Sequence, residues 1–179
     1  ELGLSLFEQV LAVHTRVSFP KGWAQARNNL GNAYQSRIRG EKEQNFEKAI
    51  DNYRQALEIR TREAFPEDWA ETLNNLANIE RIRASGKDLD QAIQHLLQVL
   101  DVYTLESYPQ FCARTHNNLA IMYSERQQGT RSENIDRAVQ HYWQALEVYT
   151  PRDFPDRCLY SARALGNLAF EEQRWDLAK

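Results

Sequence analysis

The stretch RNNLGNAY, residues 27–34, has the composition of a helix apart from its three asparagines. Asparagine is a poor helix former because its short amide competes for backbone hydrogen bonds, at a cost of roughly 0.5–0.7 kcal/mol relative to alanine. Related stretches recur as LNNLANIE at 73–80 and HNNLAIMY at 116–123. The chain therefore repeats an unfavourable helical residue, and the asparagines need an explanation of their own.

An aromatic residue followed by proline marks the start of each repeat. The pairs lie 46, 43 and 46 residues apart and are Phe19-Pro20, Phe65-Pro66, Tyr108-Pro109 and Phe154-Pro155. A fixed period of this size is typical of helical repeat arrays. We predict one array over 1–179, with a partial repeat at 1–18, repeats at 19–64, 65–107 and 108–153, and a partial repeat at 154–179. Because both ends fall inside a repeat, we expect the chain to be a piece of a longer protein.

Each repeat is predicted to be a pair of helices joined by a loop of variable length. The first helix, helix A, begins at the proline, whose missing N–H is not needed in the first turn, and ends at about 38, 83, 126 and 172. The second, helix B, covers about 45–62, 88–105 and 133–150, where apolar residues recur at helical spacing. With few glycines and prolines, this pattern predicts an all-α fold.

Composition narrows the classes of function. The net charge is −3, from 22 basic and 25 acidic residues mixed along the chain. Such a chain has no global attraction for nucleic acid or for an anionic membrane, so we expect neither as a partner. Without an apolar run long enough to span a bilayer, we expect a soluble, cytoplasmic protein. Two cysteines are too few for a disulfide scaffold.

The repeat resembles the tetratricopeptide repeat, whose pattern is W-x2-L-G-x2-Y…A-x3-F…P. The matching residues are Leu30, Gly31, Tyr34, Ala49 and Tyr53 in one repeat and Leu119, Ala120, Tyr123, Ala138 and Tyr142 in another. The long period and the NNL triplet are similar to the subtype of kinesin light chains and of bacterial proteins that join such repeats to caspase-like (CHAT) protease domains. The resemblance implies a right-handed α-solenoid of stacked antiparallel helix pairs whose A helices line a concave groove.

On a helical wheel of about 100° per residue, the asparagines of helix A form a stripe about 100° wide, while the central leucine lies about 200° from its start. The stripe is therefore expected to lie outside the core. Its members are Asn28, Asn74 and Asn117 at the eighth residue after proline, Asn29, Asn75 and Asn118 at the ninth, and Asn32, Asn78 and Asn167 at the twelfth.

The family resemblance implies that such asparagines hold the backbone of a bound peptide, because an amide both donates and accepts hydrogen bonds. The alternative is that the amides bond to one another or to the next A helix; it stays open above all for Asn28, Asn74 and Asn117, nearest the helix seam. Beside the stripe lies a variable column, with one residue from each repeat and a different residue type in each, which would supply specificity. Its members are Gln25, Glu71, Arg114 and Tyr160. The predicted peptide-binding residues are Asn29, Asn32, Asn75, Asn78, Asn118, Asn167, Gln25, Glu71, Arg114, Tyr160 and Arg163.

No motif points to catalysis, a metal or a cofactor, and we expect none of the three. Cys112 and Cys158 occupy equivalent positions one repeat apart, too distant for a disulfide, and are expected to be small core residues. Cys112 and His116 lie four residues apart on one helix, but nothing supplies an orienting acid or an oxyanion hole. His14, His95, His116 and His141 lack metal-binding spacing.

Arginines and lysines near the ends of the A helices could form a basic edge, but we favour a role in complementing the helix dipoles. They are Arg37, Arg39, Lys42, Arg81, Arg83, Lys87, Arg126 and Arg131.

The sequence thus predicts a protein–protein interaction module that binds a peptide or partner segment. Two alternatives remain: a regulatory arm of a larger multidomain enzyme, in which Trp143 could mark a contact with another domain, and an architectural scaffold.

Overall fold

The computed structural model describes residues 2–84 and 87–171. Those residues form helices without any strand, as the sequence predicted. The chain divides into two compact units, Glu1–Ala84 and Ser85–Lys179, called unit 1 and unit 2 below. Within the described ranges the helices are α1 (Leu2–Val13), α2 (Pro20–Gln35), α3 (Lys42–Leu57), α4 (Pro66–Ala84), α5 (Asp90–Leu100), α6 (Pro109–Glu125), α7 (Arg131–Leu146) and α8 (Pro155–Glu171).

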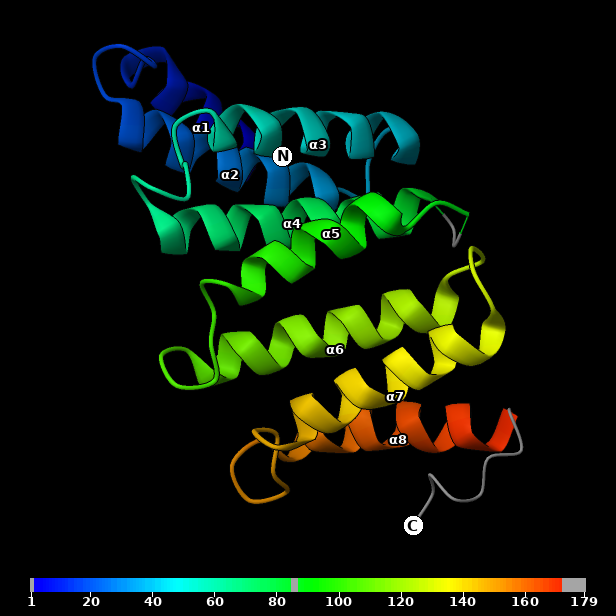
Figure 1. Cartoon of the computed structure of the whole chain (residues 1–179). Helices are drawn as coiled ribbons and strands as arrows, with labels where there is room; N and C mark the ends of the chain where they lie inside the picture. Colours follow the sequence, from blue (N-terminus) through cyan, green and yellow to red (C-terminus); the bar gives the residue numbers. More distant parts are fainter. Residues whose placement is uncertain (1, 85–86, 172–179) are drawn as a thin grey trace. The chain divides into compact units, whose positions relative to one another are not determined.

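Neighbouring helices in the chain pack against one another within each unit. In unit 1, α2 packs on α1 and α3, and α3 packs on α4 (Figure 1). In unit 2, α6 packs on α5 and α7, and α7 packs on α8. The A helices of the repeats are α2, α4, α6 and α8, and the B helices are α3, α5 and α7, with α1 at the position of a B helix. This consecutive stacking is that of a helical repeat solenoid.

The packing face of the A helices lies where the wheel predicted it. The central leucines Leu30, Leu76, Leu119 and Leu165 are all buried. Next to Leu30, a Cβ at Gly31 would lie only 2.4 Å from a ring carbon of Tyr53, so glycine lets α2 and α3 approach closely. The residue types of the repeat pattern are therefore set by contact between an A helix and its B helix.

A threonine turn, missed in the sequence analysis, ends each B segment. The α-helical residues of α3 end at Leu57 and those of α7 at Leu146, about four residues before the predicted ends. The chain then turns through a threonine five residues before each proline. The side-chain oxygens of Thr15, Thr61, Thr104 and Thr150 accept the backbone N–H three residues later, and their carbonyls accept the N–H of the aromatic residue four later. This local bonding competes with continuation of the helix.

Two of the A–B loops share a second turn that needs glycine. Gly40 and Gly129 have φ angles of +83° and +76°, in the left-handed region that L side chains rarely adopt. An asparagine five residues later closes each loop. Asn45 Nδ2 donates to the Arg39 carbonyl at 2.9 Å, and Asn134 Nδ2 donates to the Gln128 carbonyl at 2.8 Å. The two loops therefore have the same kind of turn, with a left-handed glycine and a closing asparagine hydrogen bond.

Candidate functional site

Two of the three asparagines at the eighth position after proline lie deeper in the protein than expected. Asn28 and Asn74, at the eighth residue after proline, are 1% and 2% exposed. The expectation that the whole stripe lies outside the core is therefore wrong for these two positions. The wheel treats a helix in isolation, whereas each of these asparagines lies near the seam with a neighbouring helix, where the neighbour covers it.

The third such asparagine, Asn117, is partly buried and bonds to the next A helix. Its Oδ1 accepts a hydrogen bond from Ser161 Oγ of α8 at 2.8 Å. A bond of this kind is expected if the asparagines hold neighbouring A helices together and do not contact a ligand. It leaves the two amide N–H groups of Asn117 as its remaining donors.

The outer asparagines of unit 1 are more accessible. Asn32 is exposed, and Asn29, Asn75 and Asn78 are half-buried. Asn75 Nδ2 donates to Asn32 Oδ1 at 3.3 Å, so α2 and α4 bring two predicted site residues together. The Tyr53 hydroxyl also lies 2.7 Å from Asn32 Oδ1. One amide–amide hydrogen bond therefore joins these two A helices, and Asn32 is engaged through its oxygen.

Arg60, which no sequence pattern singled out, organises the variable column of unit 1. Its side chain is 3% exposed at the end of the segment that follows α3. Arg60 Nη2 donates to Gln25 Oε1 at 2.6 Å, and Nη1 lies 3.5 Å from Glu71 Oε2. Arg60 also donates to Thr72 Oγ1 at 2.8 Å.

A comparison of equivalent repeat positions could have revealed this residue. Where unit 1 has Arg60, the later repeats have Tyr103 and Tyr149, which are also buried. A charged residue in a column of buried aromatic residues implies polar partners. The partners here are the predicted column residues Gln25 and Glu71, so the structure brings these two together around one guanidinium.

Unit 2 brings together the other two members of the variable column. Arg114 of α6 and Tyr160 of α8 line one cavity of about 240 Å³ with Asn117 and Arg157. Tyr160 is 56% exposed. The predicted site residues of this unit therefore lie around a hollow between two A helices.

The remaining predicted residues of unit 2 lie on α6 and α8. Asn118 is half-buried, and Arg163 and Asn167 are exposed. Arg163 and Asn167 are one helical turn apart and so lie on one face of α8. No contact in the structure joins them to the cavity around Arg114 among the residues described.

The cysteines are free, as predicted, with Cys112 buried and Cys158 half-buried. Burial raises the pKa of Cys112, with the charge of Glu147 adding to the effect, so the thiolate that a nucleophile needs is disfavoured. Cys112 and His116 line a cavity of about 360 Å³, but the hydrogen bond of His116 goes elsewhere.

His116 and His141 form a close pair between α6 and α7. Their Nδ1 atoms lie 3.0 Å apart, which requires one of the two nitrogens to carry the proton and the other to accept it. Burial, and then the charge of His141, lower the pKa of His116 to about 4. Burial also lowers the pKa of His141. Both imidazoles are therefore neutral near pH 7 and serve as packing and hydrogen-bonding groups.

Several arginines of the predicted basic edge form contacts within their own units. Arg83 Nη2 lies 2.5 Å from Glu47 Oε1, and Arg126 Nε donates to Asp90 Oδ1 at 2.7 Å. Arg131 Nη1 donates to the Ser124 carbonyl at 2.6 Å. These contacts favour a structural role for the edge, though through side-chain pairing more than through the helix dipole.

None of the described helices combines the length and the apolar character that a bilayer crossing requires.

A comparison with curated proteins finds no match for the chain. A scan against protein-family models matches residues 41–105. This segment contains α3, α4 and α5, with the threonine turn between α3 and α4. The matched model is that of the tetratricopeptide repeat, and the match, together with the consecutive stacking of antiparallel helices, supports the tetratricopeptide repeat family.

Proposed function

We propose that the chain is a non-catalytic protein–protein interaction module that binds an extended peptide or partner segment along its A helices. Tetratricopeptide repeats generally mediate interactions between proteins. The observation that supports the proposal best is the pair of amides of Asn32 and Asn75, 3.3 Å apart on neighbouring A helices. Peptide backbone amides have the same donors and acceptors, so a peptide could replace or extend this bond.

The accessible amides are the ones that would contact the peptide. Asn29, Asn75 and Asn118 share the ninth position after proline and are half-buried in their respective units. Partly buried groups bind well because they are preorganised and yet reachable. We therefore assign them a ligand contact, and assign Asn28 and Asn74 a structural role.

The test is capture of peptides from a degenerate nonapeptide library by the wild type and by the triple variant Asn29/Asn75/Asn118→Ala. We expect saturable capture by the wild type and at least about tenfold weaker capture by the variant, since three hydrogen bonds of about 0.5–1.5 kcal/mol each are removed. The matched control is Gln94/Gln98/Gln140→Ala, which removes three exposed amides from the B helices α5 and α7. Equal capture by all three folded proteins would overturn the assignment of the amides.

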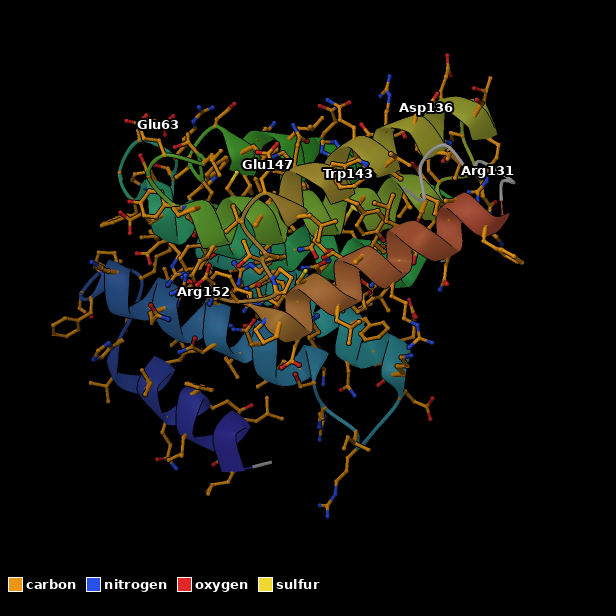
Figure 2. The ribbon with its side chains drawn as sticks, turned by 90° about the horizontal axis from the view of Figure 1, so that it is seen from below. Glu63, Arg131, Asp136, Trp143, Glu147 and Arg152 are labelled. Carbon is orange, nitrogen blue, oxygen red and sulfur yellow. The ribbon has the colours of Figure 1, made fainter. Side chains whose placement is uncertain are left out.

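A second candidate function, a regulatory arm that packs on another domain, has one observation in its favour. Trp143 on α7 is 48% exposed, and Figure 2 shows it on the same helix as Asp136, with Glu147 directly after the end of that helix. Exposed tryptophans are enriched in interfaces between proteins. The similarity of the long repeat to kinesin light chains and to repeat–CHAT proteins is compatible with this role.

This candidate predicts that Trp143→Ala weakens capture of a folded partner domain while peptide capture is unchanged. Loss of peptide capture in the Trp143→Ala variant would instead place Trp143 in the peptide site and contradict the regulatory role.

A further inference from the structure

A cavity of about 360 Å³ in unit 2 lies between α6, the end of the α7 segment and the turn that follows α5. Its lining includes Leu105 from the turn, Cys112 and His116 from α6, and Gln144 and Glu147 from the α7 segment. The cavity reaches solvent, because Leu105 is 51% exposed and Glu147 is also exposed. Its volume falls within the roughly 300–1,000 Å³ of ligand pockets, so it can hold one long side chain of a partner.

Glu147 is the charged group of this cavity. Burial raises the pKa of Cys112 and lowers the pKa of His116 to about 4, so both are neutral near pH 7. The charge of Glu147 adds to the rise at Cys112, because its carboxylate lies near the thiol. No described side chain forms a hydrogen bond or an ion pair with this carboxylate. The cavity therefore offers one negative charge beside a mostly apolar wall.

The equivalent place in unit 1 is occupied by an arginine. Arg16 directly follows the turn threonine Thr15, and Glu58 lies three residues before the next turn threonine, Thr61. Arg16 Nη1 lies 2.5 Å from Glu58 Oε2. The guanidinium carbon of Arg16 also lies 5.9 Å from the centre of the ring of Trp23, the third residue after proline in α2. In unit 1 a guanidinium thus pairs with the carboxylate and lies over an aromatic ring.

Unit 2 keeps the carboxylate but has lost the other two groups. By the same count, Glu147 is equivalent to Glu58, while Leu105 replaces Arg16 and Cys112 replaces Trp23. The cation has become a leucine, and the large indole has become a small thiol. All three of these unit 2 residues line the cavity. The absence of an arginine at this place accounts for both the space and the unpaired charge.

We propose that this cavity binds an arginine side chain of a partner protein, with Glu147 as its counterion. The bound arginine would take the role that Arg16 has in unit 1. Arginine suits the cavity better than lysine, because its planar guanidinium pairs with a carboxylate through two parallel hydrogen bonds and is less strongly hydrated. None of the predicted peptide-binding residues lines this cavity, so the inference adds a second contact to the proposed function and does not depend on the asparagines.

The test is a nuclear magnetic resonance titration of the isotope-labelled protein with the Nα-acetyl amides of arginine, citrulline and lysine. Citrulline keeps the shape of arginine without its charge. We expect saturable shifts of the backbone N–H groups of Leu105, Gln144 and Glu147. The arginine amide should bind roughly fivefold more tightly than the citrulline amide, as for an exposed ion pair.

Two variants and a control assign the effect to the cavity. Glu147→Gln should bind the arginine and citrulline amides equally. Leu105→Arg restores the residue type of unit 1, so the protein's own side chain should pair with the carboxylate and abolish the saturable shifts. Asp136→Asn removes another exposed carboxylate from α7, about three helical turns away (Figure 2), and should keep the fivefold preference.

Equal binding of the arginine and citrulline amides to the wild type, or no saturable shift at these N–H groups, would overturn the inference whether or not the variants fold. Tighter binding of the lysine amide would overturn the choice of arginine. Loss of the preference in Asp136→Asn would show that it reflects overall charge and would also overturn the inference. These outcomes are independent of nonapeptide capture, which tests the asparagines of the A helices.

Discussion

At the scale of the residue, Gly31 shows how one missing side chain sets a helix contact. We expect Gly31→Ala to lower the free energy of unfolding by roughly 1–2 kcal/mol, because the added methyl group would clash with the Tyr53 ring and the gain in helix propensity only partly offsets overpacking. Urea unfolding followed by circular dichroism measures the change.

The matched control for Gly31 is Gly166→Ala in α8, where no described atom lies within 4 Å of the added Cβ. Helix propensity alone should then raise the free energy of unfolding, by up to about 1 kcal/mol. Equal effects of the two substitutions would contradict the close contact between α2 and α3.

The pair of His116 and His141 should make stability depend on pH. Burial lowers the pKa of His116 to about 4 in the folded state, below its usual value of 6.5. The unfolded chain therefore binds a proton first, so this contribution is complete above pH 6.5 and is lost as the pH falls towards 4. We expect the free energy of unfolding to fall between pH 7 and pH 5, and to fall less steeply in His116→Gln. Identical slopes for the two proteins in urea titrations would show that the pair is not protonated on unfolding.

Residue identity alone did not reveal which asparagines are buried. Asn28 and Asn29 are neighbours of the same type, yet only the first is in the core, because exposure depends on where the adjacent helices lie. For the same reason Arg60 was missed: its burial becomes visible only when α2, α4 and the end of the α3 segment are seen together.

At the scale of the element, the threonine turn positions each A helix against the preceding B helix. We expect Thr61→Val to lower the free energy of unfolding by about 0.5–1.5 kcal/mol, because the Ala64 N–H loses the side-chain acceptor that lies 3.2 Å away. Thr61→Ser keeps the hydroxyl and should cost less. Chemical denaturation of both variants tests this, and a larger loss in the serine variant would show that the methyl group matters more than the hydrogen bond.

The helices themselves were largely predictable because two local signals mark them. Proline begins α2, α4, α6 and α8 at the predicted residues, and the apolar spacing placed the B helices. The ends of the B helices were predicted too late, because apolar residues continue into the threonine turn. Arg60 and Tyr103 are buried after the helix has ended. Periodic burial therefore indicates where a segment packs, but a side-chain hydrogen bond decides where its helix stops.

At the scale of the whole molecule, repetition provides the framework and departures from it provide the candidate site. The buried leucines and the threonine turns recur in both units, whereas the variable column changes between them. Unit 1 pairs Arg60 internally, whereas in unit 2 the Nε and Nη2 atoms of Arg114 have no hydrogen-bond partner among the residues that the structure describes. The sequence could identify this column, but only the structure shows which of its members meet a partner.

The most direct test of peptide binding by the A helices is a nuclear magnetic resonance titration of the side-chain amides. A peptide recovered from the nonapeptide library is added to the labelled protein, and the Asn and Gln N–H resonances are followed. We predict saturable shifts for Asn29, Asn75 and Asn118 on the A helices, with Gln94 and Gln140 on the B helices unchanged. Shifts confined to the B-helix amides, with the A-helix asparagines unmoved at saturation, would contradict the account.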